Sequence, residues 1–341
     1  MKILLQAYNT FAQNPGGGVQ TRLRSLYEEY KKQGVNVHLF DKWNTKIDDY
    51  DLIHFFKVTI DNYGLMVYAH SKGKKIVVSS VVPLDQAFRI KAHLLLNKLF
   101  PLHTLFEINK RCMDLSDLVI TQSQTESGFI HKNYKIPYKK LTALPNGVAS
   151  RVVGGDPDLI RKELPFSGDF VLQVGRIDSN KNQLSTIRAL KGTGIPLVIV
   201  GGPDPQEPQY LDMCKKEADE KVYFTGWIPL SDPRLASVYS AAKVLVLPSK
   251  KEIYGNAIIE GAIAGCNLAC SNVIPIVDWN IGDFIRTFNP NSVPDIKKAL
   301  LEAFNASAIL GQKDKFKDFF SWERIAKEHI KLYRSILDEE K

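Results

Sequence analysis

The sequence lacks any run of apolar residues approaching the roughly 18 that a membrane-spanning helix needs. Met1 and Lys2 are followed at once by a short strand-like run, with no small-residue cleavage site, so no signal peptide is expected. The four cysteines are too few and too scattered for a disulfide framework, and no second Cys or His pair accompanies Cys266 and Cys270 to complete a zinc site. We therefore expect a cytoplasmic protein with reduced thiols and no bound metal.

The length of 341 residues predicts roughly two domains of about 150 residues each. The formal net charge of +8 favours an anionic partner. By itself this charge does not choose among nucleotides, nucleic acid and an anionic membrane surface.

Short apolar runs alternate with helix-like stretches along most of the chain. In the first half they are residues 3–8, 35–40, 52–56, 75–82 and 117–123. Clusters rich in Gly, Pro and Asp at residues 154–157 and 165–169 then indicate a connection, after which a new sheet begins at Phe170. This alternation predicts an α/β protein with parallel, doubly wound sheets. We expect an N-terminal domain at residues 1–165 and a second domain at residues 166–318.

The stretch from Pro248 to Gly265 combines a strand end, a loop and a helix start. The apolar run 244–247 predicts a buried strand, and residues 257–264 are small and apolar enough to pack closely as a helix. Helix starts at strand ends bind phosphate, whereas carboxylates beside them suit the hydroxyls of a ribose or a sugar. Glu252 and Glu260 are therefore candidates for hydroxyl binding. The alternative, a helix-capping Glu252 and a solvated surface Glu260, stays open.

A second loop with phosphate-binding character follows the strand that begins at Phe170. Gly175 permits close approach of a ligand, and the cations Arg176 and Lys181 can converge on one pair of phosphates. The alternative is that both are ordinary surface cations. Their position at a strand end favours phosphate binding.

Three consecutive glycines lie in the loop at residues 14–19, between the first strand and the first helix. Among them Gly17 and Gly18 are candidates for holding phosphate or sugar oxygens through their N–H groups. A plain flexible turn is the alternative. The dinucleotide pattern Gly-x-Gly-x-x-Gly does not occur here.

The spacing of these groups resembles that of a known family. Pro248-Ser249 precedes Glu252 and Glu260 in a Glu-x7-Glu pattern, with Tyr-Gly between the acids and Gly-Ala-x-Ala-Gly from residue 261. This signature is similar to that of the retaining GT-B glycosyltransferases of family 4 (glycosyl transferases group 1). Ser116-Asp117 and the Pro-Asn-Gly-Val run at 145–148 match further passages of that family in the expected order.

The resemblance implies two Rossmann-like doubly wound domains that face a central cleft, with the donor held by the second and the acceptor mostly by the first. It implies transfer of a hexosyl group from a nucleoside-diphosphate sugar to a glycan or lipid-linked acceptor, as in polysaccharide biosynthesis, with retention at the anomeric carbon. No metal, no further cofactor and no nucleic-acid partner are expected. The closing helix, residues 319–341, is expected to pack back on the N-terminal domain.

By the same resemblance, the catalytic residues are Glu252, Arg176 and Lys181. The donor-binding residues are Gly17, Gly18, Gly175, Trp227, Ile228, Tyr254, Gly255, Asn256 and Glu260. Two other functions stay open: a nucleotide-sugar epimerase of the same fold, and a catalytically silent protein that binds sugar nucleotides.

The chain departs from the family at one position. Family members often place a histidine just after the strand that corresponds to residues 75–82, whereas residues 79–85 here contain no imidazole. His54, at the end of an earlier strand, is a weak substitute, because a lone histidine at a strand end is more often structural. This departure puts a catalytic histidine in the first domain in doubt.

Residues 86–111 mix leucine and phenylalanine with five cations, Arg89, Lys91, Lys98, Lys110 and Arg111. One interpretation is an amphipathic basic segment in peripheral contact with the inner face of an anionic membrane, which would favour a lipid-linked acceptor. The other is a pair of core-packing helices broken at Pro101.

Overall fold

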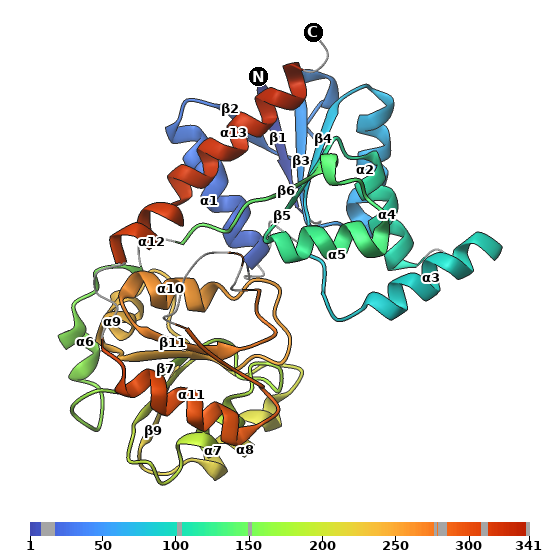
Figure 1. Cartoon of the computed structure of the whole chain (residues 1–341). Helices are drawn as coiled ribbons and strands as arrows, with labels where there is room; N and C mark the ends of the chain where they lie inside the picture. Colours follow the sequence, from blue (N-terminus) through green and yellow to red (C-terminus); the bar gives the residue numbers. More distant parts are fainter. Residues whose placement is uncertain are drawn as a thin grey trace. The chain divides into compact units, whose positions relative to one another are not determined.

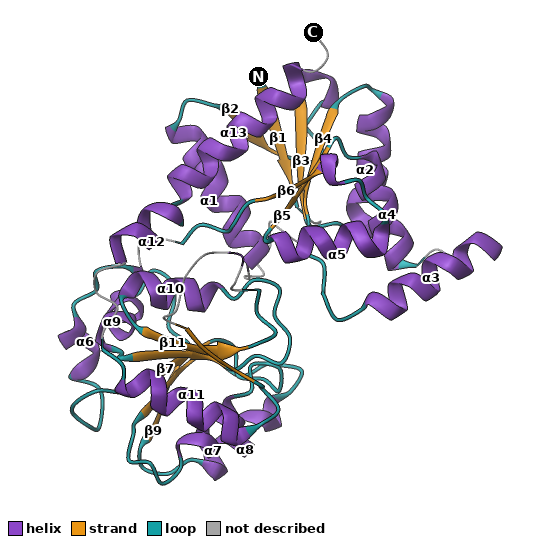
Figure 2. Cartoon of the chain, in the orientation of Figure 1, coloured by secondary structure: helices purple, strands orange, loops and turns teal. Residues whose placement is uncertain are grey.

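The computed structural model describes residues 1–7, 18–100, 104–148, 152–275, 278, 285–307 and 313–338. The chain forms two compact units (Figures 1 and 2). Unit 1 contains Met1–Gly147 and Trp322–Lys341, and unit 2 contains Val148–Ser321. The cleft predicted between two domains stays a prediction.

Unit 1 is a parallel sheet flanked by helices (Figure 2). Within the described residues, its six strands follow the order β2-β1-β3-β4-β5-β6, and every neighbouring pair is parallel. The strands are β1 (Lys2–Gln6), β2 (Asn36–Leu39), β3 (Leu52–Phe56), β4 (Lys75–Ser79), β5 (Leu118–Thr121) and β6 (Leu141–Ala143). The α-helices are α1 (Gly18–Lys32), α2 (Ile60–Ser71), α3 (Ala87–Leu99), α4 (Leu105–Leu115), α5 (Gln124–Tyr134) and α13 (Trp322–Asp338).

Unit 2 repeats this plan. Its described strands form a second parallel sheet in the order β12-β11-β10-β7-β8-β9. The strands are β7 (Val171–Val174), β8 (Leu197–Val200), β9 (Val222–Gly226), β10 (Val244–Leu247), β11 (Asn267–Ser271) and β12 (Ile285–Phe288). The α-helices are α6 (Pro157–Arg161), α7 (Gln183–Leu190), α8 (Pro208–Glu217), α9 (Pro233–Ala241), α10 (Asn256–Ala264), α11 (Val293–Asn305) and α12 (Lys313–Phe319). The predicted α/β class with doubly wound parallel sheets is confirmed.

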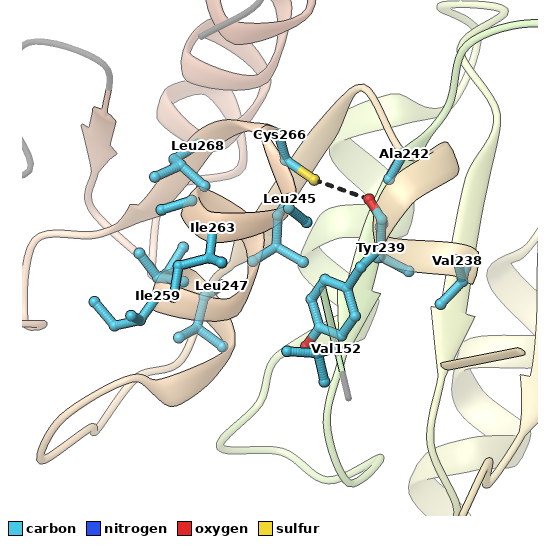
Figure 3. Close-up of a cluster of buried hydrophobic side chains, with 14 of the residues drawn as sticks. Val152, Val238, Tyr239, Ala242, Leu245, Leu247, Ile259, Ile263, Cys266 and Leu268 are labelled. Atoms are coloured by element: carbon cyan, nitrogen blue, oxygen red, sulfur yellow. Dashed lines mark hydrogen bonds between the residues drawn. The ribbon is translucent and has the colours of Figure 1, made fainter. Parts of the chain in front are cut away.

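The central strands of each sheet are largely apolar because helices cover both faces of the sheet. All five residues of β3 and all four of β10 are buried. In unit 2, the β10 and β11 side chains pack against α9 and α10 around Tyr239, and the Cys266 thiol donates to the Tyr239 carbonyl at 3.3 Å (Figure 3). Asp232 caps α9 by accepting from the Arg234 N–H at 2.9 Å, and Pro233 stands in the first turn.

The units divide at Gly147–Val148, before the connection that the sequence indicates at residue 165. The reason lies in packing: Val152 and Ile160 are fully buried in the same core as Phe170 and Val238 of unit 2. Ser237 also accepts from the Ile160 N–H at 2.9 Å, which fixes α6 on α9. Residues 152–165 thus belong with unit 2, whereas the sequence-based boundary placed them in the N-terminal domain.

The last helix, α13, is part of unit 1 and packs on α1. Its Ile325, Ala326 and Ile330 enter the apolar core that also holds β1. Buried polar contacts add to this packing: the hydroxyls of Tyr333 and Tyr30 share a hydrogen bond of 2.8 Å, and Tyr333 also lies 2.6 Å from Nδ1 of His54.

His54 has a structural role. Its Nε2 lies 2.8 Å from the Ser79 hydroxyl, so both ring nitrogens have partners, and its ring stacks on Phe56 with no exposed surface. Burial, then the neighbouring His329 and Arg22, holds the pKa of His54 well below its usual value. Burial and Arg22 also lower the pKa of His329, to about 3. The structure therefore favours the structural interpretation of His54 over a catalytic one.

These histidines predict an acid-sensitive unit 1. A histidine whose pKa falls on folding binds more protons when unfolded, so its stabilising effect is present above about pH 6.5 and is lost as the pH falls below that value. The parent protein should have a lower unfolding free energy at about pH 5.5 than at about pH 7.5. Replacing His329 by Gln should make this difference smaller by about 1.4 kcal/mol. Urea denaturation at both pH values measures this change. The exposed His70, replaced by Gln, is the control and should leave the loss unchanged; an H329Q variant as acid-sensitive as the parent would contradict the prediction.

Candidate functional site

The candidate site lies at the carboxyl ends of β7 and β10 in unit 2. These strands are neighbours, and Val244 and Leu245 of β10 pair with Val171 and Leu172 of β7. From β7 the chain builds β8 and β9 on one side, and then returns to place β10 on the other side. The order of strands therefore reverses between β7 and β10, which is where open α/β sheets bind their ligands.

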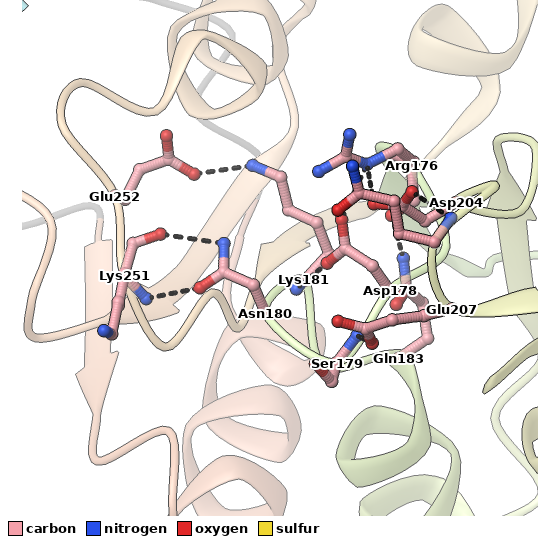
Figure 4. Close-up of polar contacts among 11 residues, drawn as sticks. Arg176, Asp178, Ser179, Asn180, Lys181, Gln183, Asp204, Glu207, Lys251 and Glu252 are labelled. Atoms are coloured by element: carbon pink, nitrogen blue, oxygen red, sulfur yellow. Dashed lines mark hydrogen bonds and ion pairs between the residues drawn. The ribbon is translucent and has the colours of Figure 1, made fainter.

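Asp178 organises the loop that leaves β7. It accepts from the Lys181 N–H at 2.7 Å and from Nε of Arg176 at 2.8 Å, as Figure 4 shows. A second carboxylate, Asp204 in the loop after β8, lies 3.0 Å from Nε of Arg176. The Arg176 side chain nevertheless stays 61% exposed. Two carboxylates thus orient a guanidinium whose outer face is open to a ligand.

The loops after β7 and β10 are bonded to each other. The Asn180 amide donates to the Lys251 carbonyl at 3.0 Å and accepts from the Lys251 N–H at 2.9 Å (Figure 4). The backbone carbonyl of Asn180 also accepts from the Lys250 N–H at 2.8 Å. These three bonds hold the two loops at a fixed separation.

The side chains of Lys181 and Glu252 join the same two loops. Nζ of Lys181 lies 2.6 Å from Oε2 of Glu252, and the two side chains are only 25% and 18% exposed. The aliphatic carbons of Lys181 lie beside Gly175. A Cβ added to Gly175 would be in ordinary van der Waals contact with them. Lys181 is therefore directed to the end of β10 by packing as well as by charge.

The two cations predicted to hold phosphate already have carboxylate partners. Arg176 and Lys181 contribute two positive charges, and Asp178, Asp204 and Glu252 contribute three negative charges, so the five sum to −1. A diphosphate at this place must therefore displace Glu252 from Lys181 or share Lys181 with it. That Arg176 and Lys181 converge on one pair of phosphates stays a prediction.

The start of α10 supplies the third part of the site. Gly255 caps the helix in the left-handed conformation, with φ +86°, and an added Cβ would lie 3.1 Å from Ile274 and 3.3 Å from Leu247. Asn256 is the first helical residue. Further along, Gly261 lets the helix press on the sheet, because an added Cβ there would lie 2.6 Å from Leu245. The start of a helix directs backbone N–H groups outward and attracts an anion.

Glu260, on α10, has a protein partner that the sequence did not indicate. The Tyr239 hydroxyl donates to its Oε2. Burial, reinforced by the charge of Glu260, holds the pKa of Tyr239 well above its usual value, so the hydroxyl stays protonated and remains a donor. Glu260 is thus a half-buried, oriented carboxylate.

The remaining predicted donor-binding residues differ in exposure. Trp227 is 70% exposed, whereas the side chains of Ile228 and Tyr254 are buried in the core of unit 2. Only the backbone of Ile228 is therefore available to a nucleobase. Gly18 opens α1 of unit 1, and Gly17 lies outside the described residues.

Sequence reasoning missed three residues of this site: Asp178, Asp204 and Tyr239. Asp178 lies inside the predicted loop. An aspartate whose carboxylate accepts from the N–H three residues later is a common turn signal. Asp204 and Tyr239 come from loops and helices remote in sequence, and no local pattern indicates them. Among the described residues, no group of three or more His, Cys, Asp or Glu side chains could hold a metal ion.

Comparison with known proteins shows what the chain is similar to. Residues 157–316 match the family model described as Glycosyl transferases group 1. An uncharacterized glycosyltransferase of Methanocaldococcus jannaschii is 28% identical over 239 residues, which cover 64% of this chain. This chain spans 60% of the length of that relative in the match.

Solved structures agree over nearly the whole chain. Sucrose-phosphate synthase from Thermosynechococcus elongatus has a TM-score of 0.78 and 19% identity, and the match covers 99% of this chain and 100% of the other. The fold is GT-B. HepE of Anabaena, solved in complex with UDP, has a TM-score of 0.75 and 14% identity, covering 98% of this chain and 100% of its own. The GT-B prediction is confirmed, and the matched family domain lies within unit 2, where the candidate site lies.

Proposed function

We propose that the chain transfers a hexosyl group from a nucleoside-diphosphate sugar to a glycan or lipid-linked acceptor, with retention at the anomeric carbon. The observation that carries this proposal is the Lys181–Glu252 pair between the ends of β7 and β10, beside the start of α10. It is supported by the matched family domain and by neighbours solved with UDP, UDP-glucose or ADP.

In this proposal, the bond between the anomeric carbon and the diphosphate breaks, and the diphosphate leaves with the electron pair. Negative charge grows on the leaving group, where Arg176, Lys181 and the N–H groups of α10 stabilise it. The acceptor oxygen forms the new bond to the anomeric carbon, and its proton passes to an oxygen of the departing diphosphate. The proposal includes no metal and no further cofactor, because Arg176, Lys181 and the N–H groups of α10 contact the leaving diphosphate directly.

The two glutamates have separate roles in the proposal. Glu252 accepts a hydrogen bond from a hydroxyl of the transferred sugar once the diphosphate has engaged Lys181. Glu260, oriented by Tyr239, accepts from the ribose hydroxyls. Trp227 and the backbone of Ile228 lie at the nucleobase.

Purified protein incubated with labelled UDP-, GDP- and ADP-sugars, with and without acceptor glycans, tests the proposal. Transfer of the label and release of the nucleoside diphosphate are expected for one of the donors. Conversion of the donor to its epimer, or binding with neither reaction, would overturn the proposal in favour of an epimerase or a silent binding protein.

The ion pair makes a separate prediction about product affinity. Replacing Glu252 by Gln removes the competitor for Lys181, so the nucleoside diphosphate should bind about tenfold more tightly while transfer becomes slower. Isothermal titration calorimetry with the nucleoside diphosphate measures the affinity. Glu217, which pairs with Arg188 and Lys191 on another part of unit 2, is the matched control as E217Q. Equal product affinity in E252Q and E217Q would show that Glu252 does not restrain Lys181.

A further inference from the structure

Helix α3 of unit 1 presents an apolar face to solvent. Phe88, Leu95 and Leu99 are 85%, 62% and 71% exposed, and their spacing of seven and four residues places them on one side of the helix. Leu96, Phe100 and Leu105 are also exposed. α3 lies at the margin of unit 1, away from its sheet (Figure 1).

The opposite side of α3 holds it to unit 1. Ile90 is fully buried and Leu94 is partly buried, in a core cluster that includes Met113 of α4 and Ile130 of α5. The core-packing interpretation of this segment therefore accounts for one side of the helix only. The exposed leucines and Phe88 have no place in that core.

Positive charge borders the apolar face on both sides. Arg89 and Lys91 are exposed and lie at about +100° and about −60° from Phe88 around the helix axis. No aspartate or glutamate occurs from Gln86 to Phe106. A helix with an apolar stripe, flanking cations and no acidic residue matches an anionic lipid surface in both polarity and charge.

We infer that this face of α3, defined by Phe88, Leu95 and Leu99 with Arg89 and Lys91, docks on an anionic membrane surface. The apolar side chains enter the boundary between headgroups and acyl chains, and the cations contact lipid phosphates. A second copy of the chain is disfavoured as the occupant, because joining two such faces brings like charges together. A protein that wraps the whole helix is disfavoured because Ile90 is buried against unit 1.

The inference goes beyond the proposed transfer reaction. Membrane docking is measured without any donor, so it can fail while glycosyl transfer holds, and the reverse is also true. Within the described ranges, no helix is long and apolar enough to cross a bilayer. The docking inferred here therefore concerns the surface of α3 alone.

Sedimentation with vesicles tests the inference on the full chain. The protein should bind vesicles of phosphatidylcholine with about 30% phosphatidylglycerol, and bind far less to phosphatidylcholine alone or at high salt. Replacing Arg89 and Lys91 together by Gln should weaken binding about 25-fold, at about fivefold for each charge. Replacing Phe88 and Leu95 together by Ser should weaken it by at least about tenfold.

The matched control for charge is the double replacement of Lys297 and Lys298, exposed on α11 of unit 2, by Gln. It should retain the binding of the parent protein. Because all the replaced side chains of α3 are exposed, unchanged thermal unfolding is expected and is measured for each variant. Binding that ignores lipid charge, binding equally weakened by the α11 control, or self-association abolished by the α3 changes would overturn the inference.

Discussion

Replacing Lys181 by Ala is expected to lower the rate of glycosyl transfer at least ~100-fold. The side chain is directed to the ends of β7 and β10 by Gly175 and Glu252, where the leaving diphosphate gains charge in the proposed reaction. Its loss removes a positioned cation and also leaves Glu252 uncompensated beside that charge. Single-turnover rates with saturating donor measure the effect on the chemical step.

Two further variants separate these causes. Lys250, exposed in the loop after β10, provides the same change of charge nearby, and K250A should transfer at close to the parent rate. Adding E252Q to K181A removes the unpaired carboxylate. Any part of the decrease in transfer rate that comes from repulsion between Glu252 and the diphosphate should then be recovered. Arg176→Ala should slow transfer by a similar factor. Parent-like rates in both K181A and R176A would overturn the assignment of the diphosphate to these loops.

Replacing Gly201 by Ala is expected to destabilise unit 2 by about 3 kcal/mol. Gly201 follows β8, and an added Cβ would lie 1.9 Å from the carbonyl oxygen of Gly175 at the end of β7. That contact forces the carboxyl ends of β7 and β8 apart. It also disturbs the hydrogen bond of 3.0 Å from the Gly175 N–H to the Val200 carbonyl. Because Arg176 follows Gly175 directly, donor affinity should fall as well. Urea denaturation and donor titration measure the two effects.

The neighbouring Gly202 provides the control. An added Cβ there would meet Cβ of Trp227 at 3.5 Å, an ordinary contact. G202A should therefore change the unfolding free energy by no more than about 0.5 kcal/mol. If G201A were as stable as G202A, the close approach between the carboxyl ends of β7 and β8 would not require a glycine at residue 201.

The strands and the loops of the site could be predicted from the sequence because they depend on local signals. β3 coincides with the predicted run 52–56, and β10 ends before Pro248 as expected. The glycine at residue 255 and the small residues after it indicated the loop and helix that the structure contains. These features follow from periodicity, chain length and backbone freedom.

The partners of the charged side chains could not be predicted, because they depend on pairing across the fold. Lys181 and Glu252 are 71 residues apart in sequence, and each has a plausible solvent-exposed alternative when considered alone. His54 and Tyr333 are 279 residues apart, so the burial of His54 depends on a helix that no local pattern connects to it. The unit boundary at Gly147–Val148 was missed for the same reason, since Gly and Pro indicate loops but not the core on which a segment packs.

The membership of α13 in unit 1 has a consequence for synthesis on the ribosome. All of unit 2 is translated before the helix that completes the core around β1 and α1. A nascent chain must therefore carry an incomplete first unit, with apolar surface open to chaperones, for the time needed to make more than half of the protein.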